Sequence, residues 1–334
     1  MANTILLAHG SGGRLSQELI TRILYPALAN PVLAQMDDAA VLELNGRIAF
    51  TTDSFVVQPI FFPGGDIGKL AVCGTVNDLA VVGARPLYLS LALILEEGLP
   101  VTELECLMES IRRAAAEAGV QIVTGDTKVV GHGSADKIFI NTAGIGRVPD
   151  RVKVSGANAR PGDRIILSGP IGDHGVAVMA RRENLRFKVP VESDCAPLNA
   201  LTAAILANPE AIHAMRDPTR GGLATTLNEI AAQSGVSLQI YEEAIPVRPP
   251  VASACEMLGL DPLYVANEGK LVAFVAAEAA PAVLATMRRQ RYAAESSIIG
   301  EVTAGNPGRV ILKTRLGASR IVDMLSGELL PRIC

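Results

Sequence analysis

The sequence predicts an α/β (α+β) protein with two domains. At 334 residues the chain is long enough for about two domains. Hydrophobic residues make up 49% of it, Trp is absent and aromatic residues are few, a composition typical of domains whose strands are buried on both faces. Predicted strands and helices alternate in both halves, which favours mixed α/β domains.

The first half contains five clear elements. Residues 48–56 predict a strand, and residues 66–83 predict an apolar helix with Asp66 at its start and Gly83 at its end. A buried strand follows over 85–95. Residues 102–118 predict an amphipathic helix that begins with Thr102 as N-cap and ends at Gly119. Two further strands are expected over 120–126 and 137–148.

A polar segment rich in Pro and Gly, residues 147–164, predicts a domain boundary. We therefore expect a first domain over 1–150 and a second over 151–315. The second contains predicted helices near 174–183, 196–207, 221–233, 250–258 and 279–290, and predicted strands at 164–169, 236–241, 270–277, 298–302 and 309–314. The remainder, 316–334, is less regular and predicts a flexible tail, with about 25–30 Å of reach from its last eight residues.

Charge and hydropathy exclude several classes of function. The net charge is −4 and no basic stripe occurs, so we expect no nucleic-acid partner. The longest apolar stretch, residues 87–95, is too short to cross a bilayer, which takes about 20 residues. The N-terminus lacks the charged and apolar regions of a secretory signal, so we expect a cytoplasmic protein without membrane contact.

Five short motifs contain an aspartate: MDDAA, TTDSF, TVNDLA, TGDTK and RDPTRGGL. In four of them the aspartate lies at a predicted strand end or in an apolar helix, where its side chain is poorly suited. Each aspartate taken alone could cap a turn. Together they indicate a site for a hard cation such as Mg²⁺ with a nucleotide. The candidate ligands are Asp38, Asp53, Asp78, Asp126 and Asp217.

Glycine-rich stretches could approach phosphate groups closely. AHGSGGR lacks the ending of a P-loop, and GPIGDHG is not a dinucleotide fingerprint, so either could be an ordinary turn. TRGGL places Arg220 and two glycines before a predicted helix, which is a natural anion site.

Two charged residues are candidates for proton transfer. Lys128 follows Asp126 at a strand end and could be a counter-charge, a phosphate ligand or an acid–base group. Glu268 lies in a turn before a buried strand and could simply form that turn. The four histidines are isolated and are interpreted as ordinary surface or turn residues.

The cysteines lack any C-x-x-C or zinc spacing. Cys73 and Cys106 lie in apolar helical patterns, and these two, with Cys195 and Cys255, are interpreted as small buried hydrophobes. Cys334 differs because it ends the chain, in PRIC, and either is an accidental free thiol or has a function.

Taken together, HGSGG, MDDAA, TTDSF, GTVNDLAVVGARP, TGDTKVV, GPIGDHG, DPTRGGL, NEG and PRIC resemble the HypE family of hydrogenase maturation proteins. That family belongs to the ATP-binding superfamily of aminoimidazole ribonucleotide synthetase, selenophosphate synthetase and thiamine-phosphate kinase. The resemblance spans the whole chain. It implies a homodimer in which N-terminal domains pair strands, with ATP and Mg²⁺ between the two domains.

The resemblance also implies the chemistry. The C-terminal cysteine receives a carbamoyl group from HypF, ATP drives dehydration of the thiocarboxamide to a thiocyanate, and cyanide passes to iron on the HypC–HypD complex. By motif match, the five aspartates would bind Mg²⁺. The phosphates would lie near Gly10, Ser11, Gly12, Gly13, Asn77, Arg220, Gly221 and Gly222, and the proton-transfer candidates Lys128 and Glu268 would lie at the tip of the tail.

Cys334 is then predicted to be a swinging carrier, since a terminal thiol can visit the sites of two enzymes. The alternative is a small-molecule kinase of the thiamine-phosphate kinase type. Such a kinase would use the same aspartates but would have no use for Cys334.

Overall fold

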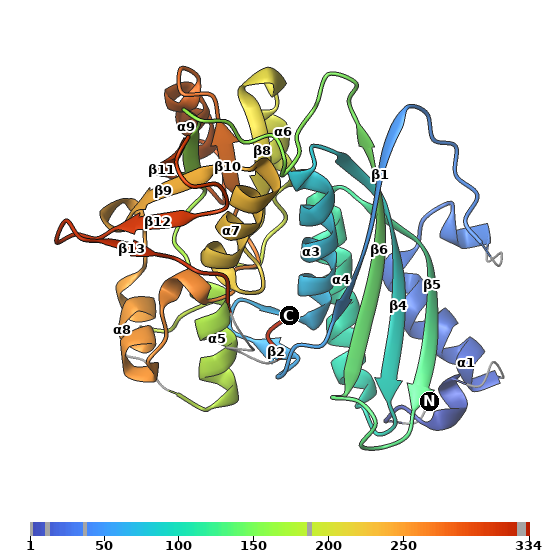
Figure 1. Ribbon diagram of the computed structural model, residues 1–334. Helices are drawn as coiled ribbons and strands as arrows, with labels where there is room; N and C mark the ends of the chain where they lie inside the picture. The colour runs from blue at the N-terminus through green and yellow to red at the C-terminus, as the bar shows by residue number, and fades with distance from the viewer. Residues whose placement is uncertain (1–2, 11–13, 36–38, 186–188, 326–331) are drawn as a thin grey trace.

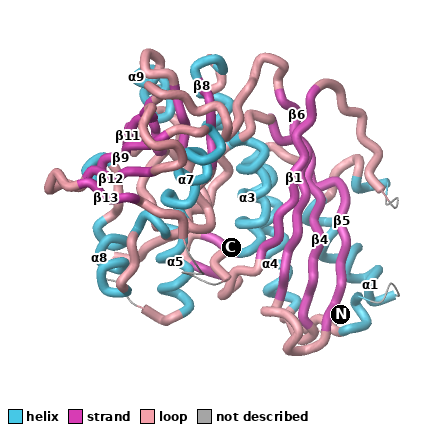
Figure 2. Tube along the Cα trace, in the orientation of Figure 1, coloured by secondary structure: helices cyan, strands magenta, loops and turns pink. Residues whose placement is uncertain are grey.

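The computed structural model describes residues 3–10, 14–35, 39–185, 189–325 and 332–334. It has a four-stranded sheet and a seven-stranded sheet, with helices between and around them, so the predicted α/β class is confirmed. The long strands of the first sheet lie on one side of the molecule and the shorter strands of the second on the other (Figures 1 and 2).

The four-stranded sheet has the order β1-β6-β4-β5. It consists of β1 (Arg47–Phe55), β4 (Arg85–Glu96), β5 (Gln121–Val130) and β6 (Ile138–Val148). β6 pairs antiparallel with both β1 and β4, and β4 pairs parallel with β5. As a result, β1 and β5 form opposite edges of the sheet.

Two helices, α3 (Ile67–Val81) and α4 (Val101–Ala118), pack together on the side of this sheet that faces the other half of the molecule (Figure 1). α4 is amphipathic and ends at Gly119, whose φ of 69° suits glycine. α3 is apolar almost all round because it contacts α4, β1, β6 and a helix of the other half. Within α3 only Lys69 and Asp78 are not buried.

The seven-stranded sheet has the order β13-β12-β9-β11-β7-β10-β8 and is antiparallel except for the β12–β9 pair. Its strands are β7 (Arg164–Leu167), β8 (Ile212–Arg216), β9 (Ser237–Tyr241), β10 (Val272–Val275), β11 (Ser297–Thr303), β12 (Val310–Lys313) and β13 (Ser319–Ile321). The helices of this half are α5 (Asp173–Arg182), α6 (Asn199–Ile205), α7 (Gly222–Ser234), α8 (Pro249–Leu258) and α9 (Ala280–Arg288).

Short elements complete the fold. Before β1 lie η1 (Leu7–Gly10), α1 (Arg14–Leu19), the π-helical turn η2 (Ile20–Leu24), α2 (Tyr25–Leu28) and η3 (Leu33–Gln35). A two-stranded ribbon, β2 (Phe61–Phe62) and β3 (Gly65–Asp66), precedes α3. The remaining 3₁₀ turns are η4 (Pro209–Ala211), η5 (Glu242–Ala244) and η6 (Pro262–Tyr264). Within the described residues, no helix has the length and apolar character needed to cross a membrane.

Several predicted details can be compared with the structure. The side chain of Asp66 accepts a hydrogen bond from the Lys69 main chain, which confirms it at the start of α3. Thr102 as N-cap of the next helix is wrong, because Pro100 occupies that position and the helix begins at Val101. Strands β8 and β13 and the helices before β1 are absent from the prediction.

The chain end returns to the middle of the molecule. After β13 at the outer edge of the second sheet, the C-terminus lies beside α3 and β2 (Figure 1). The main-chain nitrogen of Gln58 donates to the oxygen of Arg332 at 3.1 Å, and that of Val56 lies 3.4 Å from the oxygen of Cys334. The last residues therefore pair with the segment that leaves β1.

Candidate active site

A cavity of about 550 Å³ lies between the two halves. The first half contributes β1 and α3 to its wall, and the second contributes the segment after β8, the start of the Glu268 turn and the C-terminal residue. Its ionisable lining consists of Asp53, Asp78, Arg216, Asp217, Arg220, Glu229, Glu268 and Cys334. Its size is in the range of small-molecule sites.

Two of the predicted metal ligands come from the first half. Asp53 lies on β1 and Asp78 on α3, where Asp78 accepts a 2.8 Å hydrogen bond from the hydroxyl of Thr51. Burial raises the pKa of both carboxyls, and the positive charge of Arg220 opposes this shift in each case. Asp53 and Asp78 also repel each other, which marks a site with excess negative charge.

A third predicted ligand, Asp217, follows β8. Burial raises its pKa to about 7, and repulsion from Asp78 adds to the shift. Arg220 follows in the same segment, and Gly221 and Gly222 lead into α7 with positive φ values of 76° and 62°. A Cβ at Gly222 would come within 2.5 Å of the Leu263 main-chain oxygen, so this close approach requires glycine.

Glu268 is 3% exposed and is fixed through its main chain. Its nitrogen donates to Asp194 at 3.1 Å, and its oxygen accepts from the Asn77 amide at 3.3 Å. Within the described part of the chain its Oε1 atom has no hydrogen-bond partner. Burial, followed by the negative charges around it, raises the pKa of this carboxyl well above its usual range.

Asn77 lies beside this cavity in α3 but uses its amide within the protein. Nδ2 donates to the main-chain oxygens of Ala196 and Glu268, and Oδ1 accepts from Leu198 at 2.8 Å. The side chain is 2% exposed. Asn77 therefore holds two segments of the second half against α3, and we expect it to act on Glu268 rather than to contact a nucleotide.

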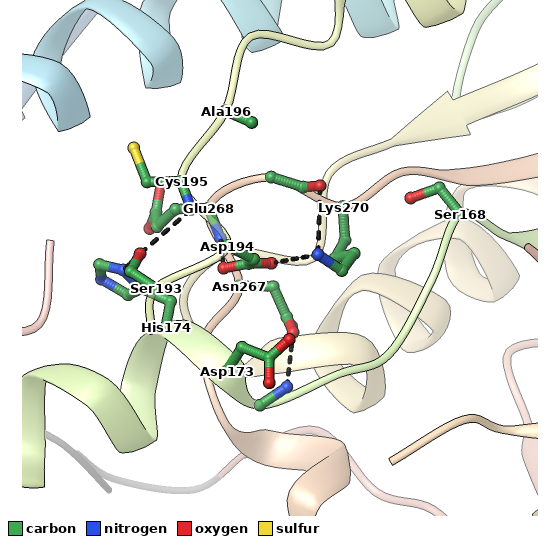
Figure 3. Close-up of polar contacts among 12 residues, drawn as sticks. Ser168, Asp173, His174, Ser193, Asp194, Cys195, Ala196, Asn267, Glu268 and Lys270 are labelled. Carbon is green, nitrogen blue, oxygen red and sulfur yellow. Dashed lines mark hydrogen bonds and ion pairs between the residues drawn. The ribbon is translucent and has the colours of Figure 1, made fainter. Parts of the chain in front are cut away.

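Buried polar contacts connect the loops of three sequence motifs. Asn267 accepts from the Gly172 nitrogen at 2.7 Å and donates to the Pro218 oxygen at 2.9 Å, so GPIGDHG, DPTRGGL and NEG meet at one side chain. Beside it, Lys270 and Asp194 form a buried ion pair at 3.0 Å (Figure 3). Asp194 thereby reaches both Lys270 and the main chain of Glu268.

Cys334 reaches the same cavity from the tail. Ile333 before it is 4% exposed and packs into the core of the first half. Burial raises the pKa of the Cys334 thiol well above its usual range, and the adjacent Glu268 carboxyl raises it further, whereas Arg220 opposes the shift. The sulfur, Glu268 and Arg220 therefore act on one another within this cavity.

The remaining predicted residues lie elsewhere. Asp126 and Lys128, on β5, form an exposed ion pair at 3.0 Å and line a second cavity of about 430 Å³ that Gly10 also lines. That cavity lies beside the helices that precede β1. Asp38, Ser11, Gly12 and Gly13 fall outside the described residues.

The carboxylates suit a cation that phosphate oxygens help to bind. No three acidic, His or Cys side chains among the described residues are arranged to hold a metal ion by themselves. Mg²⁺ commonly uses one or two carboxylates together with substrate phosphates. Asp53, Asp78 and Asp217 carry raised pKa values that a bound cation would reverse, so these residues fit such an ion.

Sequence patterns did not indicate Ser193, Asp194, Lys270 or the contacts of His174. A lysine at the entry to an apolar strand, as in GKLVAFV, is the one available signal, because a buried lysine requires a partner. The identity of that partner, Asp194, depends on a contact across 76 positions of sequence that no local pattern predicts.

Models of AIR synthase related proteins match most of the chain, the N-terminal domain over residues 36–148 and the C-terminal domain over 160–313. A relative from Azotobacter vinelandii, carbamoyl dehydratase HypE, is 55% identical over 99% of this chain and 97% of its own length. A relative of the same name from Escherichia coli is 46% identical over 99% of this chain and 100% of its own.

Solved structures show the same relationship as the sequence relatives. A crystal structure of hydrogenase maturation protein HypE in complex with ATP is 50% identical, with a TM-score of 0.96 over 99% of this chain and 100% of the other. A chain of a HypE–HypF complex is 51% identical, with a TM-score of 0.82 over 94% and 100%. A thiamine-monophosphate kinase from Stenotrophomonas maltophilia, 22% identical with a TM-score of 0.66 over 93% and 98%, shares the fold alone. With these likenesses over nearly its full length, the chain belongs to the HypE family of AIR synthase related proteins.

Proposed function

We propose that this protein is an ATP-dependent carbamoyl dehydratase of hydrogenase maturation. It converts a carbamoyl group, carried as a thiocarboxamide on Cys334, into a thiocyanate that donates cyanide to the iron centre of a [NiFe]-hydrogenase. The observation that carries this proposal is the terminal thiol inside a cavity with Glu268, Arg220 and three aspartates. Its relatives named carbamoyl dehydratase, and the relative crystallised with ATP, support the same conclusion.

The reaction balances as follows. The carbamoyl oxygen attacks the γ-phosphorus of ATP, so that an O–P bond forms and the bond to ADP breaks. The nitrogen then loses its two protons, the C–O bond breaks, and phosphate leaves with the former carbamoyl oxygen. What remains on sulfur is a C≡N group. Phosphorylation is needed because the oxygen of an amide is otherwise a poor leaving group.

Glu268 is proposed to accept a proton from the nitrogen. The support is its burial beside Cys334, a carboxylate oxygen without a partner in the described chain, and a raised pKa. A base with a raised pKa retains a transferred proton better than an ordinary carboxylate does. Lys128 remains a second candidate, but in this one chain it lines the other cavity with Asp126.

Arg220 and the start of α7 are proposed to receive the phosphates, with Gly221 and Gly222 allowing close approach. Arg220 faces the cavity, and its positive charge opposes the rise that burial causes in the pKa of Asp53, Asp78 and Cys334. Asp53, Asp78 and Asp217 would bind Mg²⁺, which when present neutralises charge on the phosphates.

The protonation state of the Cys334 thiol favours transfer of the carbamoyl group to it outside the cavity. Burial and Glu268 raise the pKa of Cys334, so inside the cavity the sulfur is protonated and a poor nucleophile. We propose that a HypF-like carbamoyltransferase loads the tail while it extends outward, and that HypC–HypD receives the cyanide. The relative solved as a HypE–HypF complex supports the first partner. We also propose a homodimer formed through the N-terminal domains.

Intact-mass spectrometry tests the proposal. With a carbamoyl source and a HypF-like partner, one carbamoyl adduct should appear on Cys334, and magnesium with ATP should then remove one water. A chain lacking Ile333 and Cys334 should carry no adduct. A kinase of the thiamine-phosphate type would keep its turnover after this truncation. An adduct on another residue, or no ATP-linked loss of water, would refute the proposal.

A further inference from the structure

The last three residues are held from both halves of the molecule. On the first half, the main chain of Arg332 pairs with Gln58, and Ile333 packs into the core. On the second half, Arg182 of α5 donates to the oxygens of both Gln58 and Arg332, at 2.7 Å in each case. The docked position is thus a specific one, with contacts to the main chain as well as to side chains.

His174, in the first turn of α5, contacts the main chain one residue before the carrier residue. Its ring is fully buried, and Nε2 lies 2.8 Å from the main-chain oxygen of Ile333. Nδ1 lies 2.8 Å from the hydroxyl of Ser193. The ring also lies nearly perpendicular to that of Phe62, with centroids 5.4 Å apart. Both nitrogens therefore have partners, and one of those partners is the tail.

The two partners determine the tautomer. A main-chain oxygen can only accept, so Nε2 carries the hydrogen, and in the neutral ring Nδ1 accepts from the Ser193 hydroxyl. The same Ser193 oxygen accepts from the Cys195 nitrogen at 3.1 Å. Burial lowers the pKa of His174, which agrees with a neutral ring.

The segment that orients His174 also supports Glu268. Asp194, next to Ser193, accepts from the Glu268 nitrogen and is paired with Lys270 (Figure 3). Residues 193 and 194 thus fix the group that holds the tail and the carboxyl that meets its thiol. A change in this segment would affect both sides of the Cys334 site.

We propose that His174 is a positioning residue, whose Nε2–H group holds the tail at Ile333 so that Cys334 stays beside Glu268. It does not touch the reacting atoms, because its contact is with the main chain one residue before the carrier. Breaking this hydrogen bond shifts the tail towards the undocked state, in which the thiol is accessible. The effect on dehydration rests on the proposed function, whereas docking of the tail does not.

Two substitutions at one position separate the hydrogen bond from the bulk of the ring. In His174→Gln the amide nitrogen can take the place of Nε2, whereas in His174→Asn it reaches only the place of Nδ1. The experiment measures alkylation of Cys334 by iodoacetamide, followed by mass spectrometry of each cysteine peptide. Cys106, which is exposed and not buried as the sequence predicted, reports the activity of the reagent, and buried Cys73 reports unfolding.

We expect Cys334 in His174→Asn to react about three- to tenfold faster than in the wild type, the effect of losing one hydrogen bond. His174→Gln should stay close to the wild-type rate, and Cys106 should be unchanged in all chains. Wild-type reactivity of Cys334 in His174→Asn, or an equal rise in both variants, overturns the proposal.

Should His174→Asn expose Cys73, the smaller change Ser193→Ala carries the same test, because it removes the hydroxyl that orients the His174 ring. A rise at Cys334 with Cys73 protected supports the proposal, and an unchanged rate overturns it. Single-turnover dehydration then separates the docking of the tail from the proposed function. Faster alkylation with slower dehydration supports both, whereas faster alkylation without any dehydration in the wild type defeats only the proposed function.

Discussion

The Nε2 atom of His174 lies 2.8 Å from the main-chain oxygen of Ile333, although the two residues are 159 positions apart. This contact ties the end of the chain to the first turn of α5, and the Ile333 side chain is buried in a core cluster formed mainly by the first half of the molecule. The terminal cysteine is therefore docked between the halves, at the cavity that contains Glu268 and Arg220.

Replacing Glu268 with Gln should block dehydration without blocking carbamoylation. The amide keeps the shape of the side chain but cannot accept the proton, so we expect single-turnover dehydration to slow by about 10²- to 10⁴-fold. The matched control is Glu229→Gln, on the same cavity wall, where the carboxylate is paired with Arg216 at 2.8 Å. Equal dehydration rates for wild type and Glu268→Gln would show that Glu268 does not accept the proton.

Ile333→Ala should release the tail while leaving the body of the protein stable. A buried Ile→Ala change costs about 2–5 kcal/mol where the side chain is confined, but here the last residues can leave the core together. We expect slower dehydration, unimpaired carbamoylation and a nearly unchanged urea midpoint. Leu316→Ala, at a residue that is 96% exposed, is the control. A large fall in the urea midpoint would show that Ile333 belongs to the structural core and is not a releasable anchor.

Asn77→Ala distinguishes a structural from a nucleotide-binding role. The change leaves the nitrogen of Leu198 and the oxygens of Ala196 and Glu268 without their buried partner. We expect the free energy of unfolding to fall by about 1–3 kcal/mol and dehydration to slow, with ATP affinity retained. Calorimetric titration with ATP provides the check. A large loss of affinity at normal stability would instead favour direct contact with the nucleotide.

Asp217 should make stability depend on pH in the absence of nucleotide and magnesium. Its pKa rises from 3.8 to about 7 in the folded protein. The folded state therefore keeps a proton that the unfolded chain releases, and this contribution is full below about pH 4 and lost as pH rises through about 7.

The free energy of unfolding of the wild type should consequently fall between about pH 5 and about pH 8, and less so in Asp217→Asn. Urea unfolding at the two pH values measures the difference, and Asp150→Asn, at an exposed position, is the control. The same slope in wild type and Asp217→Asn would exclude Asp217 as its source.

Local sequence patterns predicted the elements whose burial is regular. The apolar runs of β4 and α3 and the amphipathic face of α4 are each visible along most of the element. By contrast, β8 has five residues and β13 has three, too few for a period to emerge. The N-cap of α4 was misassigned because Thr102 suits a cap, yet the helix starts one residue before it.

Convergence of the aspartates depends on strand order, which local sequence does not contain. Asp53 on β1 and Asp126 on β5 both lie in the last part of a predicted strand, but these strands form opposite edges of the sheet. Asp53 therefore joins Asp78 and Asp217 in one cavity, whereas Asp126 lies in the other. The support of Glu268 by Asn77 and Asp194 likewise arises from contacts across 191 and 74 positions.

The fate of the carbamoyl oxygen tests the central claim most directly. A carbamoyl group with a heavy oxygen isotope is loaded on Cys334, ATP and magnesium are added, and the released phosphate is analysed by mass spectrometry. Activation by phosphorylation predicts that the label appears in inorganic phosphate, one atom for each thiocyanate formed. Label recovered in water, with unlabelled phosphate, would contradict it.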